Sequence, residues 1–381
     1  MPTFGDNQQG EIDHEQAERN TALTAGSAGT SMTGAEPAGA LFVAGRGTAV
    51  TDGLHYFAPS VDGWTGTQLA TVDELAALCW HPTLPIIYGL SGLGRGLMHA
   101  WHVEAVPSGP ALSLAKQDCL GEIPCDLAVD PSGRLLVAAN FGSGTLTVWS
   151  LDERGVPGSD GEIVRLEGPS LAELPQQAGP HPHQIVFDQA LLYVPDYGAD
   201  LLRRFAVEPE LGAAAALQEI DGLPVPAGTA PRHMVLWRTT SAATRLALSG
   251  ELASSFLVGP RDGSAWGVAS STRRTGAART RHPRNYPGDL KLSIDGRHVY
   301  FANRGYDTIA VFALEDDQPR LLTEVEALAA WPQHLLVQDH FLLVAGWDSS
   351  TVVALPLTNG LPGEPHVLFE CPGAAWLLPS R

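Results

Sequence analysis

The chain has 381 residues, of which 17% are charged, and it carries a formal net charge of −19 at pH 7. This length suffices for one large domain or two medium ones with a buried core. The acidity weighs against nucleic acid or an anionic membrane as a partner, because both bind cationic surfaces. With so few charges, the 41 glycines and 29 prolines favour short strands and turns over long solvated helices.

The first residues differ in composition from the remainder of the chain. Residues 1–38 have no apolar periodicity and contain the small and polar stretch TALTAGSAGTSMTGAEPAGA. We therefore predict a disordered tail at 1–38 and a folded domain at 39–381. The beginning of the chain lacks the apolar stretch of a signal peptide, and no apolar run approaches the roughly 20 residues of a membrane span. We expect a cytoplasmic protein that has no membrane partner.

The cysteines give no sign of a metal site. The four residues Cys79, Cys119, Cys125 and Cys371 form no CxxC pair and no zinc-type spacing. Reduced thiols in a cytoplasmic protein are the simplest interpretation. The stretch GLSGLGRG lacks the glycine spacing of a dinucleotide site, and neither HExxH nor an EF-hand loop occurs. The sequence predicts no metal and no other cofactor.

One unit recurs along the folded part of the chain. Each copy is a short apolar strand, a turn, a second strand, a turn rich in Gly, Asp and Ser, and a third strand of alternating apolarity. In chain order the copies begin with LCWHPTLPIIYGLSGLGRGLMHAWHVE at Leu78, PCDLAVDPSGRLLVAANFGSGTLTVWSLD at Pro124, PHQIVFDQALLYVPDYGADLLRRFAVE at Pro182, PRHMVLWRTTSAATRLALSGELASSFLVG at Pro231, PGDLKLSIDGRHVYFANRGYDTIAVFALE at Pro287 and PQHLLVQDHFLLVAGWDSSTVVALPLT at Pro332.

The spacing of these copies is roughly 40 to 60 residues, which is typical of four-stranded propeller blades. The earlier segment GALFVAGRGTAVTDGLHYFAPS supplies second and third strands but no first strand, and the C-terminal PGAAWLLPS supplies a lone first strand. Joining the two would complete a seventh blade and remove the exposed sheet edges of an open array. We predict an all-β, seven-bladed β-propeller; a β-helix, the alternative, has much shorter repeats.

Polar residues concentrate at two places in the repeat. In an antiparallel sheet the start of one strand lies beside the end of the next, so residues that enter first strands and end second strands share one face of the disc. The residues that enter first strands are Cys125, Asp126, His181, His183, Arg232, His233, Asp289, Gln333 and His334. The residues that end second strands are Asn140, Asp196, Glu251, Arg304 and Asp348. We expect them to converge around the central channel.

These residues differ in how well a turn alone explains them. Asp and Asn bond the local backbone in turns, so we expect structural roles for Asp126, Asn140, Asp196 and Asp348. Arginine and histidine gain nothing comparable, which makes Arg232, Arg304 and His183 functional candidates, together with Glu251. Substrate-binding candidates are His181, His233, Asp289 and His334, although the three histidines could instead cap carbonyl groups of the channel.

A basic loop precedes the Pro287 copy. The stretch STRRTGAARTRHPRNYPGD contains Arg273, Arg274, Arg279, Arg281 and Arg284 in an otherwise acidic chain. Arg281 and Arg284 are candidates to bind a small anionic substrate. The alternative is a solvated loop whose arginines pair with nearby acids.

Four stretches, GPHPHQIVF, PRHMVL, SGELASS and NYPGDLKLSIDGRHVYFANRGYDTIAVF, resemble the lactonase family of seven-bladed propellers. That family includes bacterial 6-phosphogluconolactonases of the cycloisomerase-2 type and the fungal carboxy-cis,cis-muconate lactonising enzyme. The likeness covers roughly residues 40 to 380. It implies four catalytic positions, which fall on His183, Arg232, Glu251 and Arg304. The family often has arginine where this chain has Gln333.

The resemblance implies a hydrolase that opens a sugar lactone, such as 6-phosphogluconolactone in the pentose phosphate pathway of carbohydrate metabolism. Glu251 or His183 would be the general base, and Arg304 and Arg232 would hold the oxyanion or an anionic group of the substrate. Two alternatives stay open. One is a cycloisomerase that acts on a muconate-like acid, and the other is a non-catalytic binding propeller. The pattern carries no prediction of oligomeric state.

Overall fold

A computed structural model describes residue 37 and residues 39–104, 107–158, 160–168, 175–239, 242–270, 282, 284–314 and 319–381 of the chain. The described strands all belong to one compact unit, Pro37–Arg381. The prediction of a disordered tail concerns residues that, except for Pro37, lie outside the described ranges. The helices within these ranges are short 3₁₀ turns, and none has the length and apolarity needed to cross a membrane.

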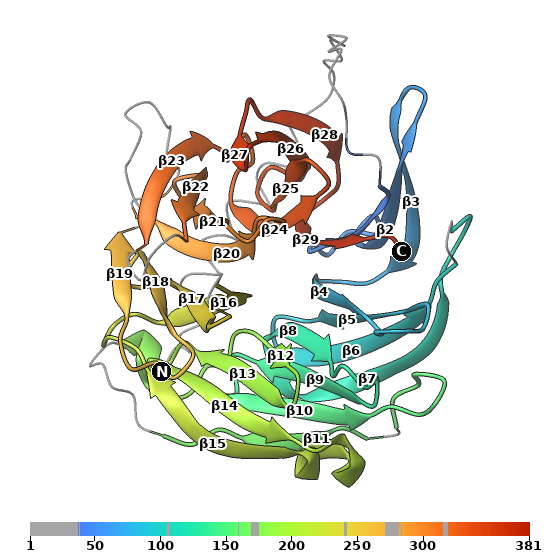
Figure 1. The fold of residues 1–381 in the computed structure, drawn as a ribbon. Coiled ribbons are helices and arrows are strands. Elements are labelled where there is room, and N and C mark those ends of the chain that lie inside the picture. The colour runs from blue at the N-terminus through green and yellow to red at the C-terminus, as the bar shows by residue number, and fades with distance from the viewer. Residues whose placement is uncertain are drawn as a thin grey trace. The chain divides into compact units, whose positions relative to one another are not determined.

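Seven antiparallel sheets are arranged around a common centre in this unit (Figure 1). The inner strands of successive blades contact one another. The predicted seven-bladed β-propeller is therefore confirmed. We number the blades in chain order from the one that contains β1, and we give the strands of each blade from the centre outwards.

Blades 1 to 3 are built from the N-terminal strands and the last strand of the chain. Blade 1 consists of β29 (Ala374–Pro379), β1 (Leu41–Gly45), β2 (Gly53–Ser60) and β3 (Gly63–Thr71). Blade 2 consists of β4 (Leu75–Trp80), β5 (Ile86–Ser91), β6 (Arg95–His102) and β7 (Leu112–Glu122). Blade 3 consists of β8 (Pro124–Val129), β9 (Leu135–Asn140), β10 (Thr145–Ser150) and β11 (Glu162–Arg165).

Blades 4 and 5 follow, and the short helices of the described ranges lie before or within blade 4. The helices are η1 (Pro175–Gln177), η2 (Pro209–Leu211) and η3 (Ala213–Ala216). Blade 4 consists of β12 (Val186–Asp188), β13 (Leu191–Asp196), β14 (Leu201–Val207) and β15 (Leu217–Pro224). Blade 5 consists of β16 (Pro231–Arg238), β17 (Thr244–Gly250), β18 (Ser255–Pro260) and β19 (Gly267–Ser270).

Blades 6 and 7 complete the ring. Blade 6 consists of β20 (Tyr286–Leu292), β21 (His298–Arg304), β22 (Thr308–Ala313) and β23 (Arg320–Glu326). Blade 7 consists of β24 (Pro332–Gln338), β25 (Phe341–Gly346) and β26 (Thr351–Thr358), with β27 (Leu361–Pro362) and β28 (His366–Glu370) both paired with β26.

The ring closes through the C-terminal strand. β29 pairs antiparallel with β1, for example Val43 with Leu377, and so provides the first strand that blade 1 lacks in its N-terminal segment. This pairing confirms the predicted closure and completes blade 1 as a four-stranded sheet.

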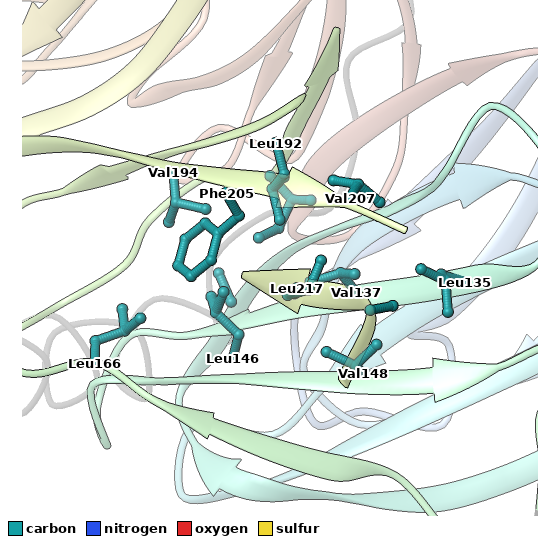
Figure 2. Packing of buried hydrophobic residues seen from close by; sticks show 13 residues of the cluster. Leu135, Val137, Leu146, Val148, Leu166, Leu192, Val194, Phe205, Val207 and Leu217 are labelled. Atoms are coloured by element: carbon teal, nitrogen blue, oxygen red, sulfur yellow. The ribbon is translucent and has the colours of Figure 1, made fainter. Parts of the chain in front are cut away.

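Apolar side chains fill the space between adjacent blades. Figure 2 shows one such cluster, in which Val137 and Leu146 of blade 3 meet Val194 and Phe205 of blade 4. Each of these four side chains is fully buried. Alternate residues of the middle strands face opposite neighbouring blades, so both faces of each sheet are covered. This packing fixes the blades against one another and thereby fixes the residues at the centre.

Candidate functional site

Each inner strand contains an irregularity near its start that re-aims its side chains. In blade 5, Pro231 pairs with Gly250 whereas Met234 pairs with Leu248, so that Arg232 and His233 together lie opposite a single residue. Comparable register shifts occur at the starts of the other inner strands. β-bulges of this kind redirect side chains and are frequent beside functional sites.

The residue that follows the last strand pair before the bulge is called the bulge position here. Around the ring these residues are Ala375, Ala76, Cys125, His183, Arg232, Gly288 and Gln333, from blade 1 to blade 7. The larger polar residues thus fall on blades 4, 5 and 7. Gly288 of blade 6 leaves room for a neighbour, because a Cβ there would lie 3.0 Å from Cδ of Arg304.

A second set of equivalent positions comes from the second strand of each blade. In each blade, one residue of the second strand pairs with the last residue of the first strand before the bulge. The residue that follows it in the chain is called the rim position here. The rim positions are Arg46, Gly92, Phe141, Tyr197, Glu251, Arg304 and Trp347, from blade 1 to blade 7. The backbone N–H of Glu251 donates to the carbonyl of Ala230 (3.0 Å), which holds the carboxylate beside the bulge of its own blade.

Three of the residues expected to converge on the channel are displaced by one residue from the rim. Asn140 and Asp196 precede it, and Asp348 follows it. Asn140 is fully buried and donates to the hydroxyls of Thr145 and Thr147. Asp196 is also fully buried and pairs with Arg203 at 2.7 Å. Both side chains therefore stabilise their own blade, which agrees with the structural roles expected for them.

The centre of the site is a carboxylate between two guanidinium groups. Oε2 of Glu251 contacts Nη2 of Arg304 and lies 3.1 Å from Nε of Arg232. Arg304 is held from several sides, because it also donates to the carbonyl of Tyr286 (3.0 Å) and to Oε1 of Gln333 (3.2 Å). Its guanidinium lies over the ring of Trp331, 5.2 Å from the centroid.

Arg232 is less completely bonded than Arg304. It is 3% exposed, and burial together with the charge of Arg304 lowers its pKa to about 10. Its contact with Glu251 lacks the angle of a hydrogen bond, and its Nη1 has no hydrogen-bond partner among the described residues. A buried guanidinium with unused donors costs free energy in the folded state unless a ligand accepts from it.

Two neutral imidazoles lie beside these charges. The rings of His183 and His233 meet edge to face at 5.3 Å between centroids. Burial and the charge of Arg232 hold the pKa of His183 well below its ordinary value and lower that of His233 to about 3. Nδ1 of His183 has no hydrogen-bond partner in the described part of the chain, whereas Nδ1 of His233 lies 2.8 Å from Oδ1 of Asp289.

Side chains at the position after the bulge link several blades to the next one. Asp126 accepts from the backbone N–H of Ile185 (2.8 Å), Gln184 from that of Met234 (2.7 Å), Asp289 from that of Leu335 (2.9 Å), and Nδ1 of His334 from that of Leu377 (3.2 Å). Asp289 also binds Lys291, with 2.7 Å between Oδ2 and Nζ. The substrate-binding candidates Asp289 and His334 thus lie in contacts between inner strands, and their assignment as ligands stays a prediction.

The remaining candidates lie at the edge of the cluster or outside the described ranges. Nδ1 of His181 donates to the carbonyl of Phe141 (2.6 Å), and its ring stacks on Phe141, so it makes the carbonyl-capping contact weighed above. Arg284 donates to the carbonyl of Leu252 (2.9 Å) and covers the ring of Tyr286. Arg281 is not among the described residues. No group of three or more His, Cys, Asp or Glu side chains in the described ranges is placed to hold a metal ion.

Several residues of the site were not among the candidates. They are Arg46, Phe141, Tyr197, Tyr286, Trp331 and Trp347. The signal that finds four of them is the alignment of the repeats on the rim position instead of on the polar residues near it. Trp331 carries a second signal, because a bulky residue at a φ of 54° adopts a backbone conformation that such residues rarely take.

The site also gives the protein a predicted dependence of stability on pH. His183, His233 and His334 all have pKa values depressed by burial, so they stay neutral in the folded state while the unfolded chain takes up protons below about pH 6.5. Asp126, whose pKa burial raises to about 7, offsets one of these protons.

The free energy of unfolding should therefore have its full value above pH 6.5 and fall as the pH is lowered towards 5. The decrease is about 1.4 kcal/mol per pH unit for each proton that the unfolded chain binds in excess of the folded protein. Guanidinium unfolding at a series of pH values measures this. A free energy that stays level or rises between pH 6.5 and 5 contradicts it.

Comparison with known sequences shows the family of the chain. The profile of the family described as lactonase, 7-bladed beta-propeller, matches residues 65–372. The chain belongs to this lactonase family. Two relatives of the chain are bacterial proteins named 6-phosphogluconolactonase. The one from Formosa agariphila is 24% identical over 320 residues, covering 79% of this chain and 87% of the relative. The one from Bacillus subtilis is 25% identical over 304 residues, covering 76% and 84%.

Solved structures share the fold of this family member. The periplasmic gluconolactonase of Pseudomonas aeruginosa superposes with a TM-score of 0.77 at 21% identity, over 90% of this chain and 99% of that one. A protein from Lactobacillus plantarum superposes with a TM-score of 0.75 at 24% identity, over 89% and 98%. At identities this low, the likeness shows the propeller fold and does not show the reaction.

Proposed function

We propose that this protein is a 6-phosphogluconolactonase-like lactone hydrolase, whose reaction belongs to carbohydrate metabolism and the pentose phosphate pathway. The observation that carries the proposal is the carboxylate of Glu251 held between Arg304 and the incompletely bonded, buried Arg232. Relatives named 6-phosphogluconolactonase support the choice of substrate class. Because Glu251 and Arg304 are in contact, one small molecule could reach both side chains.

The chemistry needs an activated water, a donor for the oxyanion and a proton for the leaving hydroxyl. Glu251 is the proposed base that takes a proton from the attacking water. Arg232 is the proposed oxyanion donor, because its Nη1 is buried and lacks a partner among the described groups. Arg304 orients Glu251 and contributes positive charge. His183, kept neutral, offers Nδ1 for a hydrogen bond with a substrate hydroxyl.

The position of the substrate's own anion follows from charge. Arg284 donates to the carbonyl of Leu252, the residue that follows Glu251, and therefore lies beside the rim. It is the proposed contact for a phosphate or carboxylate of the substrate. Arg281, which precedes Arg284 in the same basic stretch, lies outside the described residues, and its role in binding the substrate's anion stays a prediction. A reducing, cytoplasmic location is also proposed, supported by the four cysteines, which are all free thiols.

A panel of lactones tests the proposal. Acid release in a pH-stat is followed with 6-phosphogluconolactone, gluconolactone and a muconolactone-type substrate, each corrected for spontaneous hydrolysis. We expect the phosphorylated sugar lactone to give the highest kcat/KM, and Arg134→Ala, a change at a surface ion pair, to leave it unchanged. Turnover of the muconolactone alone would instead favour the cycloisomerase. No turnover of any lactone would favour a binding propeller.

A further inference from the structure

We propose that Tyr197 is the proton donor to the leaving ring oxygen, a role that rests on the proposed lactonase function. The residue occupies the rim position of blade 4, next to blade 5, whose rim position is Glu251. Two adjacent blades thus bring a tyrosine and a glutamate to equivalent positions of the ring.

The ring of Tyr197 is fixed at this place by its neighbours. Its backbone N–H donates to the carbonyl of His181 (3.0 Å), and its carbonyl accepts from Nε2 of Gln177 (2.7 Å). The phenol ring meets Phe141 edge to face at 5.5 Å, and Phe141 in turn lies 5.4 Å from the ring of His183. The residue is 6% exposed, so most of its side chain is withdrawn from bulk water.

The other groups of the cluster are poorly suited to donate this proton. His183 and His233 are neutral, and burial lowers their readiness to carry a proton at neutral pH. Arg232 is already assigned to the oxyanion, and its Nε lies 3.1 Å from the carboxylate of Glu251. The phenol of Tyr197 keeps its proton, because burial and the charge of Glu251 raise its pKa.

The proton transfers balance within one turnover. Glu251 takes a proton from water, and the hydroxide adds to the lactone carbonyl carbon to form the tetrahedral oxyanion. As the bond from that carbon to the ring oxygen breaks, Tyr197 gives its proton to the ring oxygen and becomes a phenolate. The protonated Glu251 then returns its proton to Tyr197. The sum is one lactone plus one water giving one hydroxy acid, whose carboxyl proton is released to solvent.

Tyr197→Phe keeps the ring and removes the hydroxyl. We expect kcat on the best lactone of the panel to fall at least tenfold with KM changed less than threefold, since one positioned acid contributes about 10²–10⁴-fold. Tyr193→Phe is the matched control. Tyr193 is a buried tyrosine of β13, the strand that ends directly before Tyr197. Its hydroxyl accepts from Nε of Arg261 (2.9 Å), which follows β18, and its replacement should leave kcat unchanged.

Incorporation of 3,5-difluorotyrosine at position 197 separates proton donation from packing. Its more acidic phenol should restore activity and move the alkaline limb of the pH profile of kcat/KM to lower pH. Full activity in Tyr197→Phe, or a difluorotyrosine protein whose alkaline limb does not move, overturns the inference while leaving the lactonase proposal in place. A wild-type protein that hydrolyses no lactone overturns both.

Discussion

Arg232→Met should abolish most lactone hydrolysis and leave the protein as stable as before, or more stable. Arg232 is 3% exposed, and its Nη1 has no partner in the described ranges, so the folded state gains little from its guanidinium. Methionine has similar length and no desolvation cost, and Glu251 retains its contact with Arg304. Loss of an oxyanion donor costs about 10²–10³-fold in kcat, which steady-state kinetics and guanidinium unfolding would measure together.

Arg203→Met provides the opposite pattern as a control. Arg203 is equally buried, but it bonds Asp196, Glu219 and the carbonyl of Glu167. Removing it leaves the fully buried Asp196 without its cation, which should lower the free energy of unfolding by about 3–5 kcal/mol. Activity per folded molecule should not change. If Arg232→Met loses stability as Arg203→Met does, Arg232 is a structural residue and not the oxyanion donor.

The sequence was sufficient to predict the ring and its closure. Blade repeats are visible because each inner strand must be apolar and each tight turn needs Gly, Asp or Ser, and the lone PGAAWLLPS strand has a partner only in blade 1. The prediction of Arg232, Glu251 and Arg304 as one cluster also agrees with their contacts. These residues are found because arginine and glutamate have no local reason to stand beside a tight turn.

What could not be predicted depends on single-residue register. Asn140 and Phe141 are neighbours in sequence, but the first turns into its own blade and the second faces the site histidines. Likewise the bulge sends Arg232 and His233 to different contacts, although they are adjacent. A pattern of residue types does not reveal where the bulge lies, because the bulge arises from how the inner strands pack around the ring. Aromatic rim residues were overlooked because apolar residues are expected in strands.

Glu251→Gln should lower kcat at least a hundredfold while tightening the binding of the anionic hydroxy-acid product. The amide cannot accept a proton from water, so the step assigned to the general base is lost. It also removes the negative charge that Arg304 and Arg232 now face, and a carboxylate or phosphate of the product can take that place. Single-turnover kinetics and calorimetric titration with 6-phosphogluconate measure the two effects separately.

These opposite changes distinguish a base from a residue that only holds the arginines. If Glu251 merely positioned Arg304, the glutamine side chain could still accept a hydrogen bond from it, and kcat would fall only slightly. Arg304 would in any case remain oriented by the carbonyl of Tyr286 and by Gln333. A variant that keeps wild-type kcat, or that loses affinity for the product together with activity, would therefore remove Glu251 from the chemical step and leave Arg232 and Tyr197 without a base to work with.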